Sequence, residues 1–293
     1  FTRGPAVSGT ESLPSSSNLN LEPAVRATPF LQGVQQCFDK AATTYQQGAL
    51  LQRDVAHDLH QLLLQTLSLD GGDAGNRADT QRQVLLDLGC GPGWFHVNLS
   101  VSCDELIALD LSQAMLAQAK TAGIAKQFIH ADAAAIPLAD QSVDQVFSSL
   151  MLQWCEQPQQ VFSEIARVLK PGGVFAVSTL VEESMQEFNQ AWYQLGQQAP
   201  QLEFLPTATV IKAAKDAGLV LQAQQRTYQV FFPDVVSLSR EFKQIGANYT
   251  EQKPVGLGGK SRWQAFANMY EKNRTALGLP LSYQVLMLVG TKI

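Results

Sequence analysis

The sequence predicts an α/β protein with a doubly wound sheet of seven strands. Short apolar strands alternate with helical segments from residue 84 onward, and a glycine-rich turn, GCGPG, follows the first of these strands. The chain has 293 residues, of which 45% are apolar, so it is long enough to bury a sizeable core. These observations exclude a wholly disordered chain.

The first 29 residues are rich in Ser, Pro, Gly and Asn and show no hydrophobic periodicity. We expect them to form a disordered lead or tag that precedes one domain over residues 30–293. Apolar residues then recur at helical spacing up to residue 69, and the polar sequence GGDAGN at residues 71–76 ends this pattern. Two helices are therefore predicted before the first strand.

Five predicted strands follow in order, over residues 84–88, 106–109, 127–130, 143–148 and 173–179. Between them, one helix begins at Ser112, whose hydroxyl is placed to cap it, and another covers residues 159–169. Strand, helix and strand in this succession imply right-handed parallel crossovers. Two more strands are predicted over residues 227–232 and 282–290, separated by a mostly helical pattern.

Charge is distributed unevenly along the chain. The net charge is −5, but residues 234–293 carry eight basic and four acidic residues, a net +4, which leaves −9 for the remainder. The acidic balance argues against nucleic acid as a partner, whereas the basic end suits an anionic partner. An ordinary solvated face is the alternative for the basic end. No apolar stretch approaches the roughly 18 residues of a membrane-spanning helix, so no membrane partner is expected.

The four cysteines, Cys37, Cys90, Cys103 and Cys155, form no CxxC pair and have no spacing with histidine that suggests zinc. They are expected to be small core or loop residues in a reducing compartment, the cytoplasm. His57 and His60 would be neighbours on a helix surface, but no third or fourth ligand accompanies them. No metal site is therefore predicted.

The glycine-rich turn indicates the class of cofactor. Gly89, Gly91 and Gly93 are spaced GxGxG, and Trp94 fills the position where a dinucleotide-binding turn has its third glycine. A bulky indole at this point disfavours an NAD-binding turn. Asp110 follows Gly89 by 21 residues at the end of the second strand, where a carboxylate can accept hydrogen bonds from both ribose hydroxyls.

Two further acids belong to this region. Asp132 ends the third strand over the same crevice, where it can accept the amino hydrogens of an adenine; a structural helix cap is the alternative. Asp87 is a charge in an otherwise apolar strand, and a buried carboxylate without a partner is strongly unfavourable. It is expected to hydrogen-bond the glycine loop or, through the loop, a cationic ligand.

The segments VLLDLGCGPG, ALDLS, HADAAAIPL, VDQVFSSLMLQW and VLKPGGVFAVST resemble, in order and spacing, the class I S-adenosylmethionine-dependent methyltransferases. This resemblance implies a Rossmann-like methyltransferase sheet, mostly parallel with an antiparallel last strand, and S-adenosylmethionine as cofactor. It implies that the glycine turn contacts the methionine part of the cofactor, the second-strand acid the ribose and the third-strand acid the adenine. The end of the fourth strand would close the site beside the methyl group. The cofactor-binding residues carried over are Asp87, Gly89, Cys90, Gly91, Gly93, Asp110, Leu111, Asp132, Ala133 and Ser149.

A second resemblance covers residues 38–290. The segments FDKAATTYQQGALLQRDVA, CGPGW, LQWC, STLVEES, FLP, SREFKQIGANY and LSYQVLMLVG are similar to the malonyl-acyl carrier protein O-methyltransferases of biotin synthesis. This implies methyl transfer to the free carboxylate of malonyl-acyl carrier protein or malonyl-CoA, giving the methyl ester that primes pimelate synthesis. One departure is that SSL at residues 148–150 lacks the asparagine often found after the fourth strand of these enzymes, which leaves the role of Ser149 open.

Methyl transfer from a sulfonium is an in-line displacement, and a malonyl carboxylate is already ionised at neutral pH because carboxyl groups titrate near ~4. The reaction therefore needs alignment and exclusion of water rather than a strong general base. Three catalytic candidates follow. The resemblance implies that Tyr45, in the FxxAAxxY pattern, closes over cofactor and substrate. After the fourth strand, the amide of Gln153 can orient a substrate and the indole of Trp154 can exclude water, with core packing as the alternative for Trp154.

Arg240, Lys243 and Lys260 are the substrate-binding candidates, for the malonyl group, the acidic carrier protein or the phosphate of its pantetheine arm. Surface solubility is the alternative for each. Residues 181–206 and 234–280 are expected to form helical lid insertions, and a monomer is expected. Two other functions are weighed: another small-molecule methyltransferase, acting on a quinone or small carboxylic acid, and a non-catalytic S-adenosylmethionine-binding protein.

Overall fold

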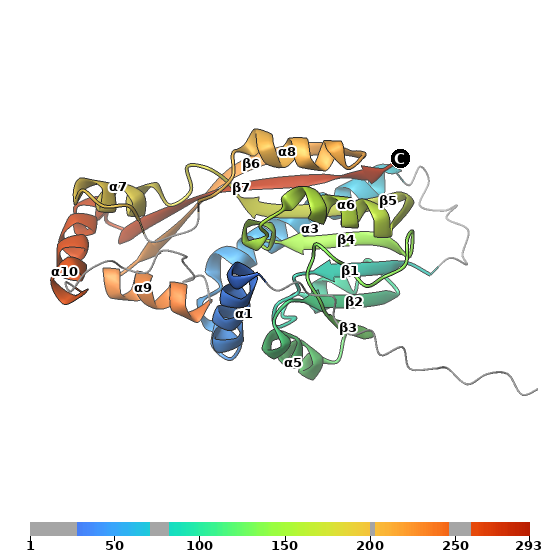
Figure 1. Ribbon diagram of the computed structural model, residues 1–293, viewed down its shortest axis with the longest axis horizontal. Coiled ribbons are helices and arrows are strands. Elements are labelled where there is room, and N and C mark those ends of the chain that lie inside the picture. Colours follow the sequence, from blue (N-terminus) through green and yellow to red (C-terminus); the bar gives the residue numbers. More distant parts are fainter. Residues whose placement is uncertain (1–27, 71–81, 200–202, 246–258) are drawn as a thin grey trace, which may run out of the picture.

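One sheet of seven strands organises the residues that the computed structural model describes, which are 28–70, 82–199, 203–245 and 259–293. The strand order is β3-β2-β1-β4-β5-β7-β6 (Figure 1). The strands are β1 (Val84–Leu88), β2 (Glu105–Asp110), β3 (Gln127–His130), β4 (Val143–Ser149), β5 (Leu169–Leu180), β6 (Leu219–Phe232) and β7 (Leu279–Lys292). β1 to β5 pair in parallel, and β7 runs antiparallel to both β5 and β6. The predicted mostly parallel sheet with an antiparallel last strand is confirmed.

Helices cover both faces of the sheet and form two apolar cores. α3 (Leu50–Asp70), α4 (His96–Leu99) and α5 (Gln113–Ala122) contribute to the core that contains Leu85 of β1. α6 (Pro158–Val168) and α8 (Thr207–Asp216) contribute to the core that contains Leu86. Successive residues of a strand point to opposite faces, so the apolar runs of β1 and β2 bury both faces at once. The hydroxyl of Ser112 caps α5 as predicted, accepting from Met115 N.

The last two strands extend beyond the rest of the sheet. β6 and β7 pair over 14 residues, whereas β5 pairs with β7 only from Val285 to Thr291. α7 (Gln186–Gln194), α9 (Val235–Gln244), α10 (Gly259–Tyr270) and the 3-10 helix η2 (Glu271–Asn273) gather around the extension, at the left in Figure 1. Trp192 of α7 stacks on Phe266 of α10 with ring centroids 4.6 Å apart. We call these helices, with the strand ends that they cover, the helical cap.

Several elements differ from the sequence-based expectation. α1 (Pro29–Ala41) begins one residue before the expected start of the domain, with Thr28 as its N-cap, and the short α2 (Tyr45–Gly48) separates it from α3. β6 begins at Leu219, eight residues before the predicted strand, because pairing with β7 engages a glutamine-rich stretch that no hydrophobic alternation marks. α8 has no counterpart among the predicted helices. The predicted lead lies, up to residue 27, outside the described residues.

His60 is a further correction. It is buried, with its ring against Phe95 and Phe147, rather than on the helix surface with His57. Among the described helices, none is both long and apolar enough to cross a membrane.

Candidate active site

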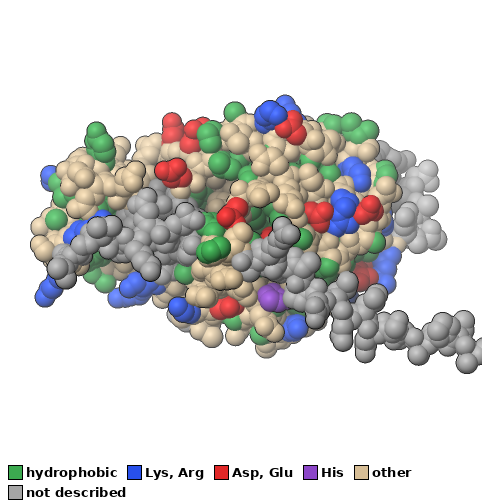
Figure 2. Space-filling view, in the orientation of Figure 1, with side chains coloured by type: hydrophobic (Ala, Val, Ile, Leu, Met, Phe, Trp, Pro, Cys, Tyr) green, Lys and Arg blue, Asp and Glu red, His purple; other side chains and the backbone are tan. Residues whose placement is uncertain are grey.

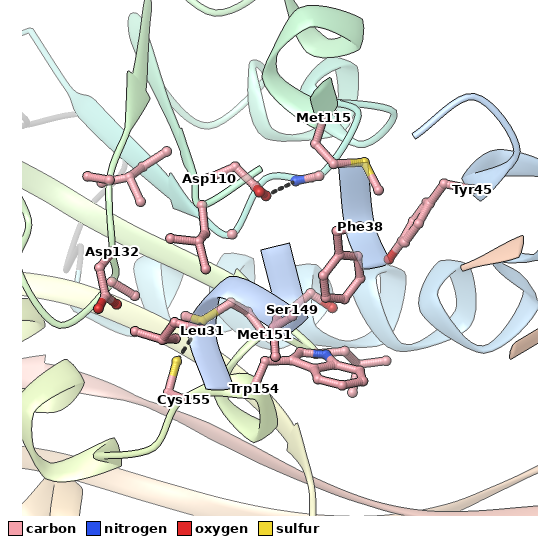
Figure 3. Close-up of a pocket in the computed structure, with 18 residues that line it drawn as sticks. Leu31, Phe38, Tyr45, Asp110, Met115, Asp132, Ser149, Met151, Trp154 and Cys155 are labelled. Carbon is pink, nitrogen blue, oxygen red and sulfur yellow. Dashed lines mark hydrogen bonds between the residues drawn. The ribbon is translucent and has the colours of Figure 1, made fainter. Parts of the chain in front are cut away.

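A cavity opens at the carboxyl ends of the central strands, where β2 lies on one side of β1 and β4 on the other. Open α/β sheets bind ligands at such a switch point. The empty space of the cavity, counted together with the open solvent at its mouth, is about 670 Å³. Figure 3 shows its lining, which comprises Leu31, Val34, Phe38, Tyr45, Gly89, Gly91, Leu109, Asp110, Leu111, Met115, Ala131, Asp132, Ala133, Ser149, Leu150, Met151, Trp154 and Cys155.

The glycine turn after β1 contributes backbone to this cavity. Gly89 and Gly91 line it with φ of 78° and 55°, the left-handed region that favours glycine. A Cβ on Gly91 would meet no atom within 4 Å, so the backbone there faces open space, whereas a Cβ on Gly89 would collide with the side chain of Met151. Gly93 serves packing instead, because a Cβ there would lie 2.8 Å from the ring of His96.

Asp110, at the carboxyl end of β2, lies beside the glycine turn. Its Oδ2 accepts a hydrogen bond from Gly91 N and its Oδ1 accepts one from Ser112 N, both at 2.8 Å. Burial raises the pKa of Asp110 to about 6; the two hydrogen bonds act against this rise, and the carboxylates of Asp87 and Asp39 add to it. The acid that the sequence assigns to the ribose therefore lies at the cavity and titrates just below neutrality.

Tyr45 of α2 reaches the same cavity (Figure 3). Burial, and then the negative charge of Asp110, raise the pKa of its phenol. Tyr45 therefore stays protonated at neutral pH and can donate a hydrogen bond into the cavity.

Asp132 lies at the end of β3 on the same cavity, and Ala133 follows it. Asp132 Oδ1 accepts a hydrogen bond from Ala134 N at 2.9 Å within a turn, and no helix begins there, so the helix cap weighed as the alternative is not formed. Leu111 lines the cavity as well, and its carbonyl oxygen lies 2.8 Å from His130 Nε2. β2 and β3 pair in parallel with Asp110 opposite His130, so their carboxyl ends place both predicted acids at one cavity.

The turn after β4 forms an apolar wall. It runs into the 3-10 helix η1 (Leu152–Trp154). The cavity-lining residues from the end of β4 to the C-cap of η1 are Ser149, Leu150, Met151, Trp154 and Cys155. Trp154 meets Phe38 of α1 edge-on, with ring centroids 5.2 Å apart. The indole therefore lies at the cavity, as the catalytic interpretation requires.

Four of the cofactor-binding and catalytic candidates do not line this cavity: Asp87, Cys90, Gly93 and Gln153. Asp87 is buried, and its Oδ2 lies 3.3 Å from His96 Nε2, so the side chain beside it is the imidazole of His96 rather than a cationic ligand in the cavity. Gln153 Nε2 donates to the carbonyl oxygen of Leu150 at 2.6 Å, and its Oε1 accepts from Thr179 Oγ1 at 3.1 Å. Both ends of the Gln153 amide therefore bond within the protein, outside the cavity lining.

α1 supplies a wall that the sequence analysis missed. Leu31, Val34 and Phe38 lie at helical spacing and line the cavity. Asp39 at the end of this helix accepts a hydrogen bond from Ser112 Oγ at 2.6 Å, which ties α1 to the start of α5. The apolar spacing is visible in the sequence, but spacing alone does not say which surface a helix covers.

The predicted substrate-binding cations lie on the helical cap rather than in the cavity. Arg240 and Lys243 of α9 line a separate groove, whose other residues are Val236, Ser239 and Trp263. Lys260, near the start of α10, is exposed and does not line that groove. Figure 2 shows Lys and Arg side chains on the surface at this end of the molecule and also over the rest of the face. In the described part of the chain, no Lys or Arg lines the cavity.

Comparison with known sequences identifies similar proteins. Residues 86–177 match a family model described as a methyltransferase domain. The malonyl-[acyl-carrier protein] O-methyltransferase of Yersinia pestis is 35% identical over 255 residues, which cover 87% of this chain and 89% of that protein. Its namesake from Marinomonas sp. is 34% identical over 93% of this chain and 98% of its own length. The biotin biosynthesis bifunctional protein BioHC of Cellvibrio japonicus is 38% identical over 88% of this chain but 50% of its own length, so the chain spans about half of that relative.

Solved structures share the fold. The YcgJ protein of Bacillus subtilis has a TM-score of 0.55 at 17% identity and covers 80% of this chain and 98% of its own. A phosphoethanolamine N-methyltransferase of Haemonchus contortus, in complex with S-adenosyl-L-methionine, has a TM-score of 0.55 at 18% identity and covers 90% of this chain and 60% of its own. At these identities the likeness concerns the fold alone.

Proposed function

The chain belongs to the family of malonyl-[acyl-carrier protein] O-methyltransferases, and from this premise we propose that it transfers a methyl group from S-adenosylmethionine to the free carboxylate of malonyl-acyl carrier protein. Malonyl-CoA presents the same carboxylate. The product is the methyl ester that primes pimelate synthesis for biotin. The observation that carries the proposal is the cavity at the switch point, where two acids, an open glycine backbone and an aromatic wall meet.

The residues that line the cavity have the chemistry needed to bind S-adenosylmethionine. Gly91, which leaves open space where a Cβ would lie, lets the methionine part approach the backbone. Asp110 would accept hydrogen bonds from the ribose hydroxyls, and Asp132 with Ala133 would receive the adenine. When bound, S-adenosylmethionine supplies an activated methyl group on a positively charged sulfur, a charge that the two carboxylates favour.

The protein must orient the acceptor carboxylate and keep water away from it. This carboxylate is ionised at neutral pH, so no general base has to remove a proton. The protonated phenol of Tyr45 can donate a hydrogen bond to one carboxylate oxygen while the other oxygen attacks. Phe38 and Trp154, in edge-on contact, exclude water from one side of the acceptor. Alignment of this kind can lower a barrier by up to roughly 7–11 kcal/mol.

The activity is tested with purified protein, labelled S-adenosylmethionine and a panel of acceptors: malonyl-acyl carrier protein, malonyl-CoA, free malonate and a quinol. We expect a labelled methyl ester on the malonyl thioester. Transfer only to the quinol or to a free acid would overturn the proposed substrate and favour another small-molecule methyltransferase. Cofactor binding without turnover on any acceptor would favour the non-catalytic alternative.

We also propose that Arg240 and Lys243 meet the acidic carrier protein rather than the malonyl carboxylate. Their groove lies on α9, and the carbonyl oxygen of Gln244, the last residue of that helix, accepts a hydrogen bond from Thr44 Oγ1 at 3.1 Å. Thr44 immediately precedes Tyr45, which lines the cavity. A carrier protein held at this groove would therefore present its pantetheine arm across α2 toward the cavity.

The docking proposal predicts an effect that depends on the carrier protein. Replacing both Arg240 and Lys243 by Ala should raise the KM for malonyl-acyl carrier protein roughly two- to thirtyfold at low salt, because each exposed ion pair contributes about 0.2–1 kcal/mol. The KM for malonyl-pantetheine, which lacks the carrier protein, should stay unchanged. The control replaces Lys212 and Lys215 of α8, outside the helical cap, and should change neither constant. An equal rise for malonyl-pantetheine would instead show that the two cations bind the malonyl group.

A further inference from the structure

The turn after β4 holds a residue in a strained backbone conformation at the cavity. Leu150, which directly follows β4, has a φ of 51°, in the left-handed region that branched and bulky residues rarely adopt. It lines the cavity and is nearly buried, with 8% of its surface exposed. Such a conformation persists only where surrounding contacts enforce it, and residues of this kind cluster at functional sites.

Both backbone polar groups of Leu150 are held by neighbouring residues. Its N–H donates to the carbonyl oxygen of Ser178 at 3.0 Å and to Ser178 Oγ at 3.1 Å. Its carbonyl oxygen accepts from Gln153 Nε2 at 2.6 Å. The other end of that amide, Oε1, accepts from Thr179 Oγ1 at 3.1 Å. Two successive residues of β5 therefore hold the turn by hydrogen bonds, Ser178 directly and Thr179 through the side chain of Gln153.

Residues on both sides of Leu150 form the cavity wall. Met151 packs against the glycine turn, at the place where a Cβ on Gly89 would lie. The N–H of Trp154 donates to the carbonyl oxygen of Met151 at 2.9 Å, so the indole is held to the same turn. A change in the backbone of Leu150 would therefore move Met151 and Trp154 relative to the glycine turn.

We propose that Gln153 and Thr179 form a positioning pair that holds Leu150 in its left-handed conformation and thereby fixes the cavity wall beside the glycine turn. Gln153 is a positioning residue rather than a catalytic one, because it does not line the cavity and both ends of its amide are occupied. The proposal rests on the proposed function only where the rate of methyl transfer is measured. Affinity for S-adenosylhomocysteine can be measured without an acceptor, so this second measurement does not depend on the proposed substrate.

The test uses variants that remove the hydrogen bonds and keep the volume. Gln153→Met and Thr179→Val should each lower kcat about tenfold, the size of effect typical of a lost buried hydrogen bond. They should weaken S-adenosylhomocysteine binding measurably and leave the KM for malonyl-acyl carrier protein nearly unchanged. Thr179→Ser keeps the hydroxyl and should behave like the unmodified protein. Because both side chains act through one chain of contacts, the double variant should be no slower than Gln153→Met alone.

The side-chain amide of a glutamine on β4 provides the matched control for Gln153, which belongs to η1. Gln145 is buried, and its Nε2 donates to the carbonyl oxygen of Ser102 at 2.9 Å, near the amino end of the strand. Gln145→Met should lower stability while kcat and S-adenosylhomocysteine affinity stay unchanged. The proposal is overturned if Gln153→Met, like this control, leaves kcat and S-adenosylhomocysteine affinity unchanged. It is also overturned if the effects of Gln153→Met and Thr179→Val on kcat add in the double variant. A rise in KM alone in Gln153→Met would overturn it too, because an amide that contacts the substrate would have that effect. If another acceptor is the true substrate, the same comparison on that acceptor and by ligand binding still decides the question.

Discussion

Replacing Asp110 by Asn separates the contribution of this residue to folding from its contribution to cofactor binding. The carboxylate accepts from Gly91 N and Ser112 N through different oxygens, whereas Asn has one acceptor, so one buried donor loses its partner, which costs about 1–3 kcal/mol. In the opposite direction, the pKa raised from 3.8 to about 6 means that ionised Asp110 destabilises the fold at neutral pH by an amount on the order of 3 kcal/mol. Asn removes that penalty. The two effects nearly cancel, and chemical denaturation should show a small change in the free energy of unfolding.

Affinity for S-adenosylmethionine should change far more than stability does. Charge-assisted hydrogen bonds to the ribose contribute about 1.5–3 kcal/mol each, so calorimetric titration of Asp110→Asn should show a Kd raised by at least tenfold at neutral pH. Affinity of the unmodified protein should also fall as the pH drops below about 6, because protonation of Asp110 removes the charged acceptor, and the variant should lack this dependence.

Asp87→Asn is the control for this prediction, since Asp87 is buried beside His96 and does not line the cavity. It should lower stability and leave the Kd for S-adenosylmethionine nearly unchanged. An unaltered Kd in Asp110→Asn, or an equal loss in Asp87→Asn, would refute the assignment of the ribose to Asp110.

Further predictions concern the glycine turn and the helical cap. Gly89→Ala should abolish measurable cofactor binding in calorimetry, because the new Cβ collides with Met151. Gly91→Ala should still fold, with its free energy of unfolding lowered by about 1–2 kcal/mol because of the positive φ. Any loss of cofactor affinity in Gly91→Ala reports a ligand close to that backbone. Burial raises the pKa of Glu241 in the helical cap from 4.5 to about 7. The folded state therefore binds more protons than the unfolded state between these values, and stability should fall as the pH rises through this window. Glu241→Gln should remove that fall in urea unfolding measured across the window; a slope that persists in the variant would contradict the argument.

Elements with strong local signals could be predicted closely. β1 and β2 are largely apolar strands buried on both faces, so each shows in the sequence as a short apolar segment that ends at the glycine turn or at an acid. Ser112 caps α5 through contacts within its own turn. β6 lacks such a signal, because its glutamine-rich residues are largely exposed and its hydrogen bonds come from β7, about sixty residues later in the chain.

The candidate site divides in the same way. Asp110 and Asp132 could be placed together from the sequence because the carboxyl ends of parallel strands meet at one edge of the sheet. The direction of a polar side chain follows no such rule. Asp87 lies beside His96, and the amide of Gln153 lies between Leu150 and Thr179, partners that periodicity does not reveal.

Hydrophobic periodicity, the glycine spacing and the acids at the strand ends thus specify the fold class and the position of the cavity, because each depends on residues near one another in the chain. The family follows from the resemblance of several segments taken in order. Contacts between distant segments settle the rest: α1 closes the cavity with Phe38, Arg240 and Lys243 lie on a separate groove, and β5 holds the turn that carries Trp154. Such contacts depend on how elements far apart in sequence pack against one another, which no local pattern encodes.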